Sequence, residues 1–225
     1  MQAVILAAGL GARMKELTRD TPKPLLKAGE KTLLEHKFHN LPAEISEVVI
    51  VVGYLGDKIK EALGAEFDGR KITYVEQTEL KGTAHALSLC EAVLNDRFLV
   101  LMGDDLYARE DLQAMRGYPL AILAWELPAD EPDKTMGELV TNGGGKLTDI
   151  VERPARKGML MNTGAYMLDR SFFDYPLVPK SSGSPEMGLP QTIVPMAKDG
   201  KDIHIVKATW WQNVTSPEDL AGKIT

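Results

Sequence analysis

A short apolar segment near the N-terminus, residues 3–8, runs directly into a turn that contains two glycines, Gly9 and Gly11. Such a segment predicts a buried strand, and the glycines let backbone N–H groups approach a ligand closely because they lack a Cβ atom. Two cations follow, Arg13 and then Lys23, which stands between two prolines. Both can balance phosphate charge. The sequence therefore predicts a strand that opens into a phosphate-binding turn.

Two commoner phosphate motifs do not fit this stretch. The dinucleotide fingerprint requires a third glycine where Met14 stands, and the P-loop requires a Gly-Lys-Ser/Thr triplet, which does not follow Gly9. The turn therefore indicates neither an NAD site nor a P-loop.

Strands and helices alternate along the first half of the chain. We predict strands at residues 4–8, 47–52, 72–76 and 98–102, and helices at residues 33–40, 57–63 and 83–94. Thr32 with Glu35 predicts a capping box for the first helix, and Thr83 is expected to cap the third. This rhythm predicts an α/β fold with a mostly parallel sheet and helices on both faces. Because ligands bind beyond the carboxyl ends of such strands, the glycine turn, Gln77 and Asp104 should meet at one edge.

The second half is less regular. We predict strands at residues 120–126, 147–152, 161–168 and 204–208, a turn at 142–146, and helices at 192–198 and 217–222. No linker or repeat divides the chain, so we predict one domain, residues 1–225. About residues 1–110 should bind the nucleotide and about 111–225 the acceptor.

The composition is typical of a soluble globular protein, with 44% hydrophobic and 26% charged residues among 225. A net charge of −6 gives no general attraction for nucleic acid or an anionic membrane. The single cysteine, Cys90, cannot form an intramolecular disulfide, so we expect a reducing, cytoplasmic location. Cys90 itself is expected to pack in a helix rather than act as a nucleophile. Because the net charge is negative, a phosphate ligand needs a local basic cluster, for which the chain offers Arg13, Lys15, Arg19, Lys23 and Lys27.

The N-terminal motif resembles the signature of the sugar-phosphate nucleotidylyltransferases. It reads Leu6-Ala7-Ala8-Gly9-Leu10-Gly11-Ala12-Arg13-Met14, followed by Pro22-Lys23-Pro24-Leu25. The resemblance, which extends from about Ala3 to Leu220, implies a Rossmann-like fold of the GT-A type. It also implies Mg²⁺-dependent transfer of a nucleotidyl group, from UTP or dTTP by preference, to a sugar 1-phosphate. Many relatives carry a C-terminal β-helix with acyltransferase activity, which is expected to be absent because this sequence ends at Thr225.

The resemblance also implies roles for individual residues. Arg13 and Lys23 are the expected catalytic cations. The nucleotide is expected to contact Leu6, Ala7, Ala8, Gly9, Gly11, Gln77, Gly82, Thr83 and Gly103. In the uridylyl and thymidylyl branches, the glutamine and the Gly-Thr pair read the pyrimidine edge. A glutamine amide suits this task because it offers both a donor and an acceptor.

The expected Mg²⁺ ligands are Asp104 and Asn213. Asp104 follows a buried strand, and Asn213 lies in a C-terminal segment that resembles the family at Trp211, Val214 and residues 217–220. This sequence departs from the family where an aspartate becomes Asn213. The uridylyltransferases that make UDP-N-acetylglucosamine also resemble this chain in having asparagine there. Since asparagine offers only a neutral carbonyl oxygen, we expect weaker Mg²⁺ binding without the triphosphate.

The acceptor is expected to contact Gly137, Glu152, Arg153 and Asn162. Gly137 and Asn162 match family positions that face the sugar, and Glu152 can accept hydrogen bonds from two hydroxyls. Arg153 replaces the usual lysine and is expected to bind the acceptor phosphate, with changed geometry.

Two alternatives remain open from the sequence. One is a CTP-dependent cytidylyltransferase that acts on a phosphorylated alcohol such as phosphocholine or inositol phosphate. The other is a non-catalytic nucleotide-sugar sensor or regulatory subunit, which only the departure at Asn213 favours. The sequence does not give the sugar, the choice between uracil and thymine, or the oligomeric state, a homo-oligomer included.

Overall fold

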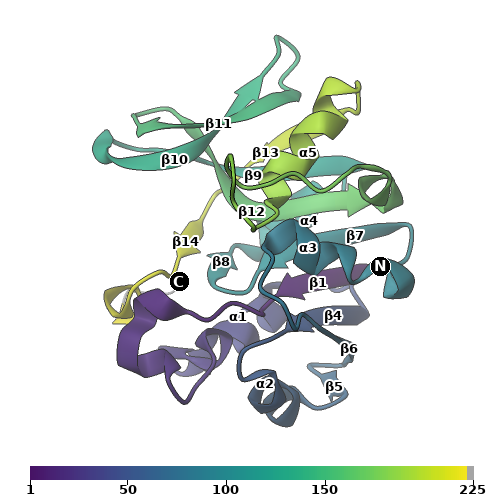
Figure 1. Cartoon of the computed structure of the whole chain (residues 1–225), viewed down its shortest axis with the longest axis vertical. Helices are drawn as coiled ribbons and strands as arrows, with labels where there is room; N and C mark the ends of the chain where they lie inside the picture. The colour runs from purple at the N-terminus through teal and green to yellow at the C-terminus, as the bar shows by residue number, and fades with distance from the viewer. Residues whose placement is uncertain (222–225) are drawn as a thin grey trace.

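The computed structural model describes residues 1–221, and its centre is one mixed sheet (Figure 1). The strands β6, β4, β1 and β7 are parallel neighbours in that order. Beyond β7, the antiparallel strand β12 pairs with β9, which β13 joins, and with β10, which β11 joins. The strands of this sheet are β1 (Gln2–Leu6), β4 (Glu47–Val52), β5 (Glu66–Phe67), β6 (Arg70–Glu76), β7 (Arg97–Met102), β9 (Leu120–Glu126), β10 (Glu131–Thr141), β11 (Leu147–Ala155), β12 (Leu160–Asp169) and β13 (Ile203–Lys207).

Helices cover both faces of the sheet, as expected. They are α1 (Leu33–Asn40), α2 (Gly56–Leu63), α3 (Thr83–Ser88), α4 (Arg109–Met115) and α5 (Leu189–Lys198). Leu87 of α3 and Ile193 of α5 are fully buried in the core on one face. Phe38, Ile59 and Leu112, from α1, α2 and α4, are buried in the core on the other. The predicted α/β fold with a mostly parallel centre is confirmed.

A small second sheet joins the middle of the chain to its C-terminal part. It pairs β8 (Asp105–Tyr107) with β14 (Trp211–Asn213), and β2 (Lys27–Ala28) pairs with β3 (Lys31–Thr32) in a short hairpin. The C-terminal segment consequently lies beside the N-terminal turn (Figure 1), where Met14, Leu106 and Val214 share one buried cluster. The 3₁₀ segments are η1 (Ala12–Thr18), η2 (Lys23–Leu25), η3 (Glu91–Val93), η4 (Arg170–Asp174) and η5 (Pro217–Ala221).

The first helix begins as the sequence predicts. The backbone N–H of Glu35 donates to the Thr32 hydroxyl at 3.1 Å, and the Glu35 carboxylate accepts from the Thr32 N–H at 2.6 Å. Burial of Cys90 is also confirmed, since its side chain is fully buried, and this burial raises the pKa of the thiol to about 12.

The predicted third helix was too long and its cap was wrong. The α-helix ends at Ser88, and a 3₁₀ bond from Cys90 N–H to Leu87 O follows. Gly82 occupies the N-cap position, while the Thr83 hydroxyl accepts a bond from the Leu189 N–H at 3.0 Å. The Thr83 hydroxyl oxygen, which was expected to cap α3, therefore accepts its hydrogen bond from a distant residue instead.

Among the strands and α-helices, those not predicted are β2, β3, β5, β8, α4, β10 and β14. The helix predicted at residues 217–222 is a 3₁₀ segment over Pro217–Ala221. Gly222, the last residue of the predicted helix, lies outside the described residues. No helix within residues 1–221 is long and apolar enough to cross a membrane.

Candidate active site

The carboxyl ends of the four parallel strands β1, β4, β6 and β7 meet at one edge of the sheet. Beyond β1, Leu6 O accepts a bond from the Gly103 N–H at 2.9 Å, and Ala7 N–H donates to Val51 O at 2.9 Å. Gln77 N–H donates to Val52 O at 2.8 Å. The structure thus brings together the glycine turn, Gln77 and the Gly103–Asp104 step.

Two glycines permit close packing at this edge. A Cβ atom on Gly103 would lie 2.6 Å from Leu6 O. Gly11 has φ +64°, and a Cβ there would lie 2.9 Å from Thr18 Cγ2 and 3.0 Å from Lys23 Cβ. Gly9, by contrast, is exposed and has no atom within 4 Å of its missing Cβ, so a ligand can approach the turn there.

Lys23 and Asp104 form an ion pair at the centre of this edge. The Lys23 Nζ atom lies 2.6 Å from Asp104 Oδ2. The lysine side chain is 10% exposed and the aspartate side chain 37%, so the carboxylate is the more accessible partner of the pair. Arg13, the other expected catalytic cation, is exposed on η1. The cations and the acidic residue are therefore placed where anionic oxygens can reach them.

A buried polar layer lies behind this pair, and the sequence analysis missed it. Lys37 is 2% exposed and its ammonium donates to Asp105 O at 2.5 Å. Burial lowers the pKa of Lys37 to about 8, although the Asp105 and Asp104 carboxylates oppose the shift. Burial and the adjacent Asp104 raise the pKa of the Asp105 carboxyl well above its usual range, although a hydrogen bond from Asn213 opposes this. The one local signal for this burial was the helical spacing of Lys37, four residues after the buried Leu33 on α1.

Asn213 is oriented by this layer. Its Nδ2 group donates to Asp105 Oδ1 at 2.5 Å, which leaves its amide oxygen as the remaining ligand atom. The neighbouring Val214 N–H donates to Asp104 O at 3.3 Å, so β14 is held against Asp104.

These residues fit a magnesium ion. Within residues 1–221 no group of three His, Cys, Asp or Glu side chains forms a cage for a metal. Mg²⁺ is typically bound by one or two carboxylates together with substrate phosphates rather than by an all-protein cage. One carboxylate on Asp104 and one amide oxygen on Asn213 match that pattern.

Gln77 is nearly buried, at 5% exposure, beside the start of α3. Its Nε2 lies 3.1 Å from Gly82 O and 3.1 Å from His85 Nδ1. Gly82 has φ +90°, and a Cβ there would lie 2.4 Å from Met187 O. Met187 N–H donates to Lys81 O at 2.7 Å, so a segment from the second half of the chain supports this loop.

The expected acceptor residues lie on β10, β11 and β12. Gly137 and Glu152 are direct partners in the β10–β11 ladder. Arg153 pairs with Glu138 at 3.1 Å, and Arg156 also binds this carboxylate, with a shortest contact of 2.5 Å. The sequence analysis missed Glu138, which is only 9% exposed. Because its partners Arg153 and Arg156 come later in the chain, beyond the turn between β10 and β11, no local sequence signal marked Glu138 as paired.

Asn162 links the acceptor residues to the nucleotide edge. Its Nδ2 donates to the Tyr166 hydroxyl at 2.7 Å, and its Oδ1 accepts from the Gly164 N–H at 3.0 Å. Gly164 has φ +81°, and a Cβ there would lie 2.5 Å from Met102 Cγ and 3.5 Å from Asp105 Oδ2. The strand β12 therefore carries Asn162 close to the buried polar layer.

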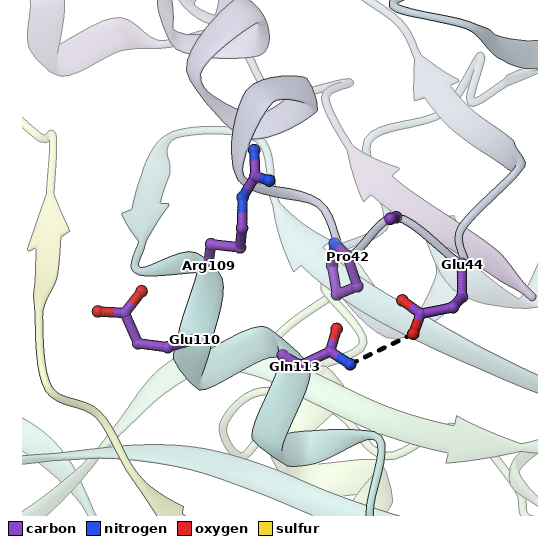
Figure 2. A pocket seen from close by; sticks show the side chains of 6 residues that line it. Pro42, Glu44, Arg109, Glu110 and Gln113 are labelled. Atoms are coloured by element: carbon purple, nitrogen blue, oxygen red, sulfur yellow. Dashed lines mark hydrogen bonds between the residues drawn. The ribbon is translucent and has the colours of Figure 1, made fainter.

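Two hollows open on the surface of the described residues. One, of about 630 Å³, adjoins Gln77 at the carboxyl ends of β4 and β6. The other, of about 360 Å³, lies near the amino end of β4, where Gln113 Nε2 donates to Glu44 Oε1 (Figure 2). Its lining includes two carboxylates, those of Glu44 and Glu110, so it does not suit a triphosphate.

A comparison with protein families decides the assignment. The family model described as nucleotidyl transferase matches residues 2–223. The chain belongs to this nucleotidyl transferase family. The expectation of a nucleotidyltransferase enzyme is therefore confirmed.

Individual relatives agree with the family. The chain is 32% identical over 232 residues to the UTP–glucose-1-phosphate uridylyltransferase AglF of Haloferax volcanii, covering 97% of this chain and 93% of that protein. It is 28% identical to the bifunctional protein GlmU of Methanocaldococcus jannaschii, of which it spans 52%, with 98% of this chain covered. A crystal structure described as a glucose-1-phosphate thymidylyltransferase from Bacillus anthracis superposes with a TM-score of 0.80 at 26% identity, covering 98% of this chain and 92% of that one.

Proposed function

We propose that this nucleotidyltransferase transfers a uridylyl or thymidylyl group from UTP or dTTP to a sugar 1-phosphate, releasing pyrophosphate. The observation that carries the proposal is the Lys23–Asp104 pair at 2.6 Å, beside an open glycine turn at the carboxyl edge of the sheet. The uridylyltransferase from Haloferax volcanii and the thymidylyltransferase from Bacillus anthracis support the choice of substrates.

The proposed reaction is a direct displacement. An oxygen of the acceptor phosphate attacks the α-phosphorus, a new P–O bond forms, and the bond from the α-phosphorus to the bridging oxygen of pyrophosphate breaks. No general base is required because the acceptor phosphate is already anionic at neutral pH. Catalysis then depends on positioning and on charge compensation, which Lys23 and Arg13 supply on the triphosphate.

Asp104 and Asn213 would hold the Mg²⁺ ion. When bound, this ion neutralises phosphate charge as pyrophosphate departs. Asp105 and Lys37 do not reach the substrates in this proposal. The Asp105 carboxylate orients Asn213 by accepting a hydrogen bond from its Nδ2 group. Lys37 holds the backbone of β8 by donating to Asp105 O.

The two substrates divide between the two halves of the chain. Residues of the first half, up to about 110, hold the nucleotide through the turn after β1, Gln77, Gly82 and Thr83. The second half holds the acceptor through Gly137, Glu152, Arg153 and Asn162. The ladder partnership of Gly137 and Glu152 supports this division, because it brings these two acceptor residues side by side on β10 and β11. We also expect the enzyme to work in the cytoplasm without nucleic acid, and we leave its oligomeric state to measurement.

The test is pyrophosphate release with Mg²⁺ over a grid of nucleoside triphosphates against sugar 1-phosphates and phosphocholine. We expect release with UTP or dTTP and a sugar 1-phosphate. Release only with CTP and a phosphorylated alcohol would favour the cytidylyltransferase alternative. Nucleotide binding without release in any combination would favour the sensor alternative.

The variant Lys23→Ala tests the role of the ion pair. We expect turnover to fall by at least about a hundredfold, as when one preorganised charge is removed from a site of this kind. Lys31→Ala, at an exposed position in β3, is the matched control and should keep turnover near that of the wild type. Comparable turnover of Lys23→Ala and Lys31→Ala would refute the assignment.

A further inference from the structure

We propose that His85 is a positioning residue that sets base preference by fixing the Gln77 amide with its oxygen toward the base. This makes the site favour uracil and thymine over cytosine. The inference rests on the proposed function, because it assumes that a pyrimidine nucleotide binds beside Gln77. His85 itself does not touch the nucleotide.

The partners of Gln77 fix the orientation of its amide. Gly82 O is a carbonyl oxygen and can only accept, so the amide atom 3.1 Å away must be the donor Nε2. The opposite orientation would place two acceptor oxygens against each other. The second hydrogen of Nε2 is directed to His85 Nδ1, also at 3.1 Å. This nitrogen must therefore accept, which places the imidazole proton on Nε2 of His85.

Both amide hydrogens of Gln77 are consequently used by the protein. Within residues 1–221 no donor binds Gln77 Oε1, so an acceptor oxygen is what this side chain offers to a ligand. Gln77 is placed to do so, since it lines the hollow of about 630 Å³ at the carboxyl ends of β4 and β6. This hollow lies at the same edge of the sheet as the turn that is expected to hold the nucleotide.

The ring nitrogen N3 separates the pyrimidines. It carries a hydrogen in uracil and thymine and has a lone pair in cytosine. A protein acceptor that faces N3 therefore binds uracil and thymine and repels cytosine. A site built around such a hydrogen bond discriminates strongly between these bases. Contact at the exocyclic group on C4 would instead favour the amine of cytosine, so the measured preference tests the proposed direction.

His85 is needed because the Gly82 carbonyl alone holds only one of the two amide hydrogens. Without an acceptor at Nδ1, the second hydrogen of Gln77 loses its partner, and Gly82 O alone holds the amide in this orientation. The opposite orientation, which presents N–H groups to the base, then becomes less unfavourable. A hydrogen bond of this kind contributes about 1 kcal/mol, which corresponds to roughly a fivefold to tenfold change in an equilibrium. Loss of His85 should therefore weaken discrimination rather than abolish nucleotide binding.

The experiment measures dissociation constants for UTP, dTTP and CTP by calorimetry in the wild type and three variants. His85→Leu removes the acceptor, whereas His85→Asn supplies an amide oxygen close to the position of Nδ1. Leu89→Ala, at an exposed position just beyond α3, is the matched control. Thermal unfolding and far-ultraviolet circular dichroism of each variant establish that it is folded.

We expect the wild type, His85→Asn and Leu89→Ala to prefer UTP over CTP by similar factors, about a hundredfold or more. His85→Leu should reduce that factor at least fivefold. A wild type that prefers CTP, an unchanged ratio in His85→Leu, or a reduced ratio in His85→Asn would each overturn the inference. Because binding is measured directly, these outcomes are separate from the proposed function, which fails if no triphosphate supports pyrophosphate release.

Discussion

Replacement of Gly82 by alanine provides a quantitative test of how the nucleotide loop is built. Gly82 has φ +90° and ψ 179°, a region that residues other than glycine adopt only at a cost of about 1–3 kcal/mol. The added Cβ would also lie 2.4 Å from Met187 O and 2.7 Å from Met187 N, so the backbone of this segment must move.

Movement of that backbone breaks specific hydrogen bonds. Met187 N–H donates to Lys81 O at 2.7 Å, and Ala84 N–H donates to Met187 O at 2.9 Å. Each such bond contributes about 1 kcal/mol. Adding the loss of both to the backbone strain, we expect Gly82→Ala to lower the free energy of unfolding by about 3–5 kcal/mol.

The matched control is Gly69→Ala. Gly69 also has positive φ, +71°, but no atom lies within 4 Å of its missing Cβ. Its replacement should cost only the strain of a left-handed residue, about 1–2 kcal/mol. Urea unfolding of both variants gives the comparison directly. Equal losses in the two variants would refute the argument that Met187 packs against the glycine face of the loop.

Two further predictions concern the acceptor and the buried polar layer. Arg153→Ala should raise the KM for the sugar 1-phosphate with little change in the KM for the nucleotide. Arg156→Ala, which loses an ion pair with the same Glu138, is the control and should change neither KM. Equal effects of the two variants on the KM for the sugar 1-phosphate in steady-state kinetics would contradict this. Between pH 8 and pH 10.5 the unfolded chain binds more protons at Lys37 than the folded protein does, because burial holds the folded pKa at about 8. The free energy of unfolding of the wild type should therefore rise relative to that of Lys37→Met across this window, and a constant difference in urea unfolding at pH 7.5 and pH 10.5 would contradict the assigned pKa.

Local signals predicted much of the first half correctly. The apolar run at residues 47–52 and the capping box at Thr32 are decided by neighbouring residues, and the structure has both as expected. The strand at residues 120–126 was also predicted with its observed bounds. In each case the residues that determine the element are contained within it, so a short window of sequence is sufficient.

Elements that depend on distant partners were not predictable in this way. The strands β8 and β14 have only three residues each and pair Asp105 with Asn213, which lies 108 residues later in the chain. The strand β10 includes Pro132 and Gly137, both of which disfavour strands when judged locally. For Thr83, the partner of the hydroxyl is the Leu189 N–H, which no local rule identifies.

The same distinction between local and distant determinants applies to the candidate site. Its position at the carboxyl edge of the sheet was predictable from strand order, because parallel strands bring their ends together. The burial of Lys37 and Asp105 did not follow, since charged residues are almost never fully buried unless paired, and their partners lie far away in the sequence.

The arm formed by β10 and β11 has a consequence for engineering this enzyme. It projects from the body of the molecule (Figure 1), and within the described residues it pairs with the rest of the sheet at two places, Glu138 with Met161 of β12 and Lys146 with His204 of β13. The four strands β6, β4, β1 and β7 do not pair with it. An exchange of residues 131–155 between family members would therefore replace three of the four proposed acceptor contacts while leaving the nucleotide edge intact. Separating the two halves of the chain would instead remove β12 from its pairing with β7. The apolar strand β7 would then become an exposed edge strand, which favours aggregation.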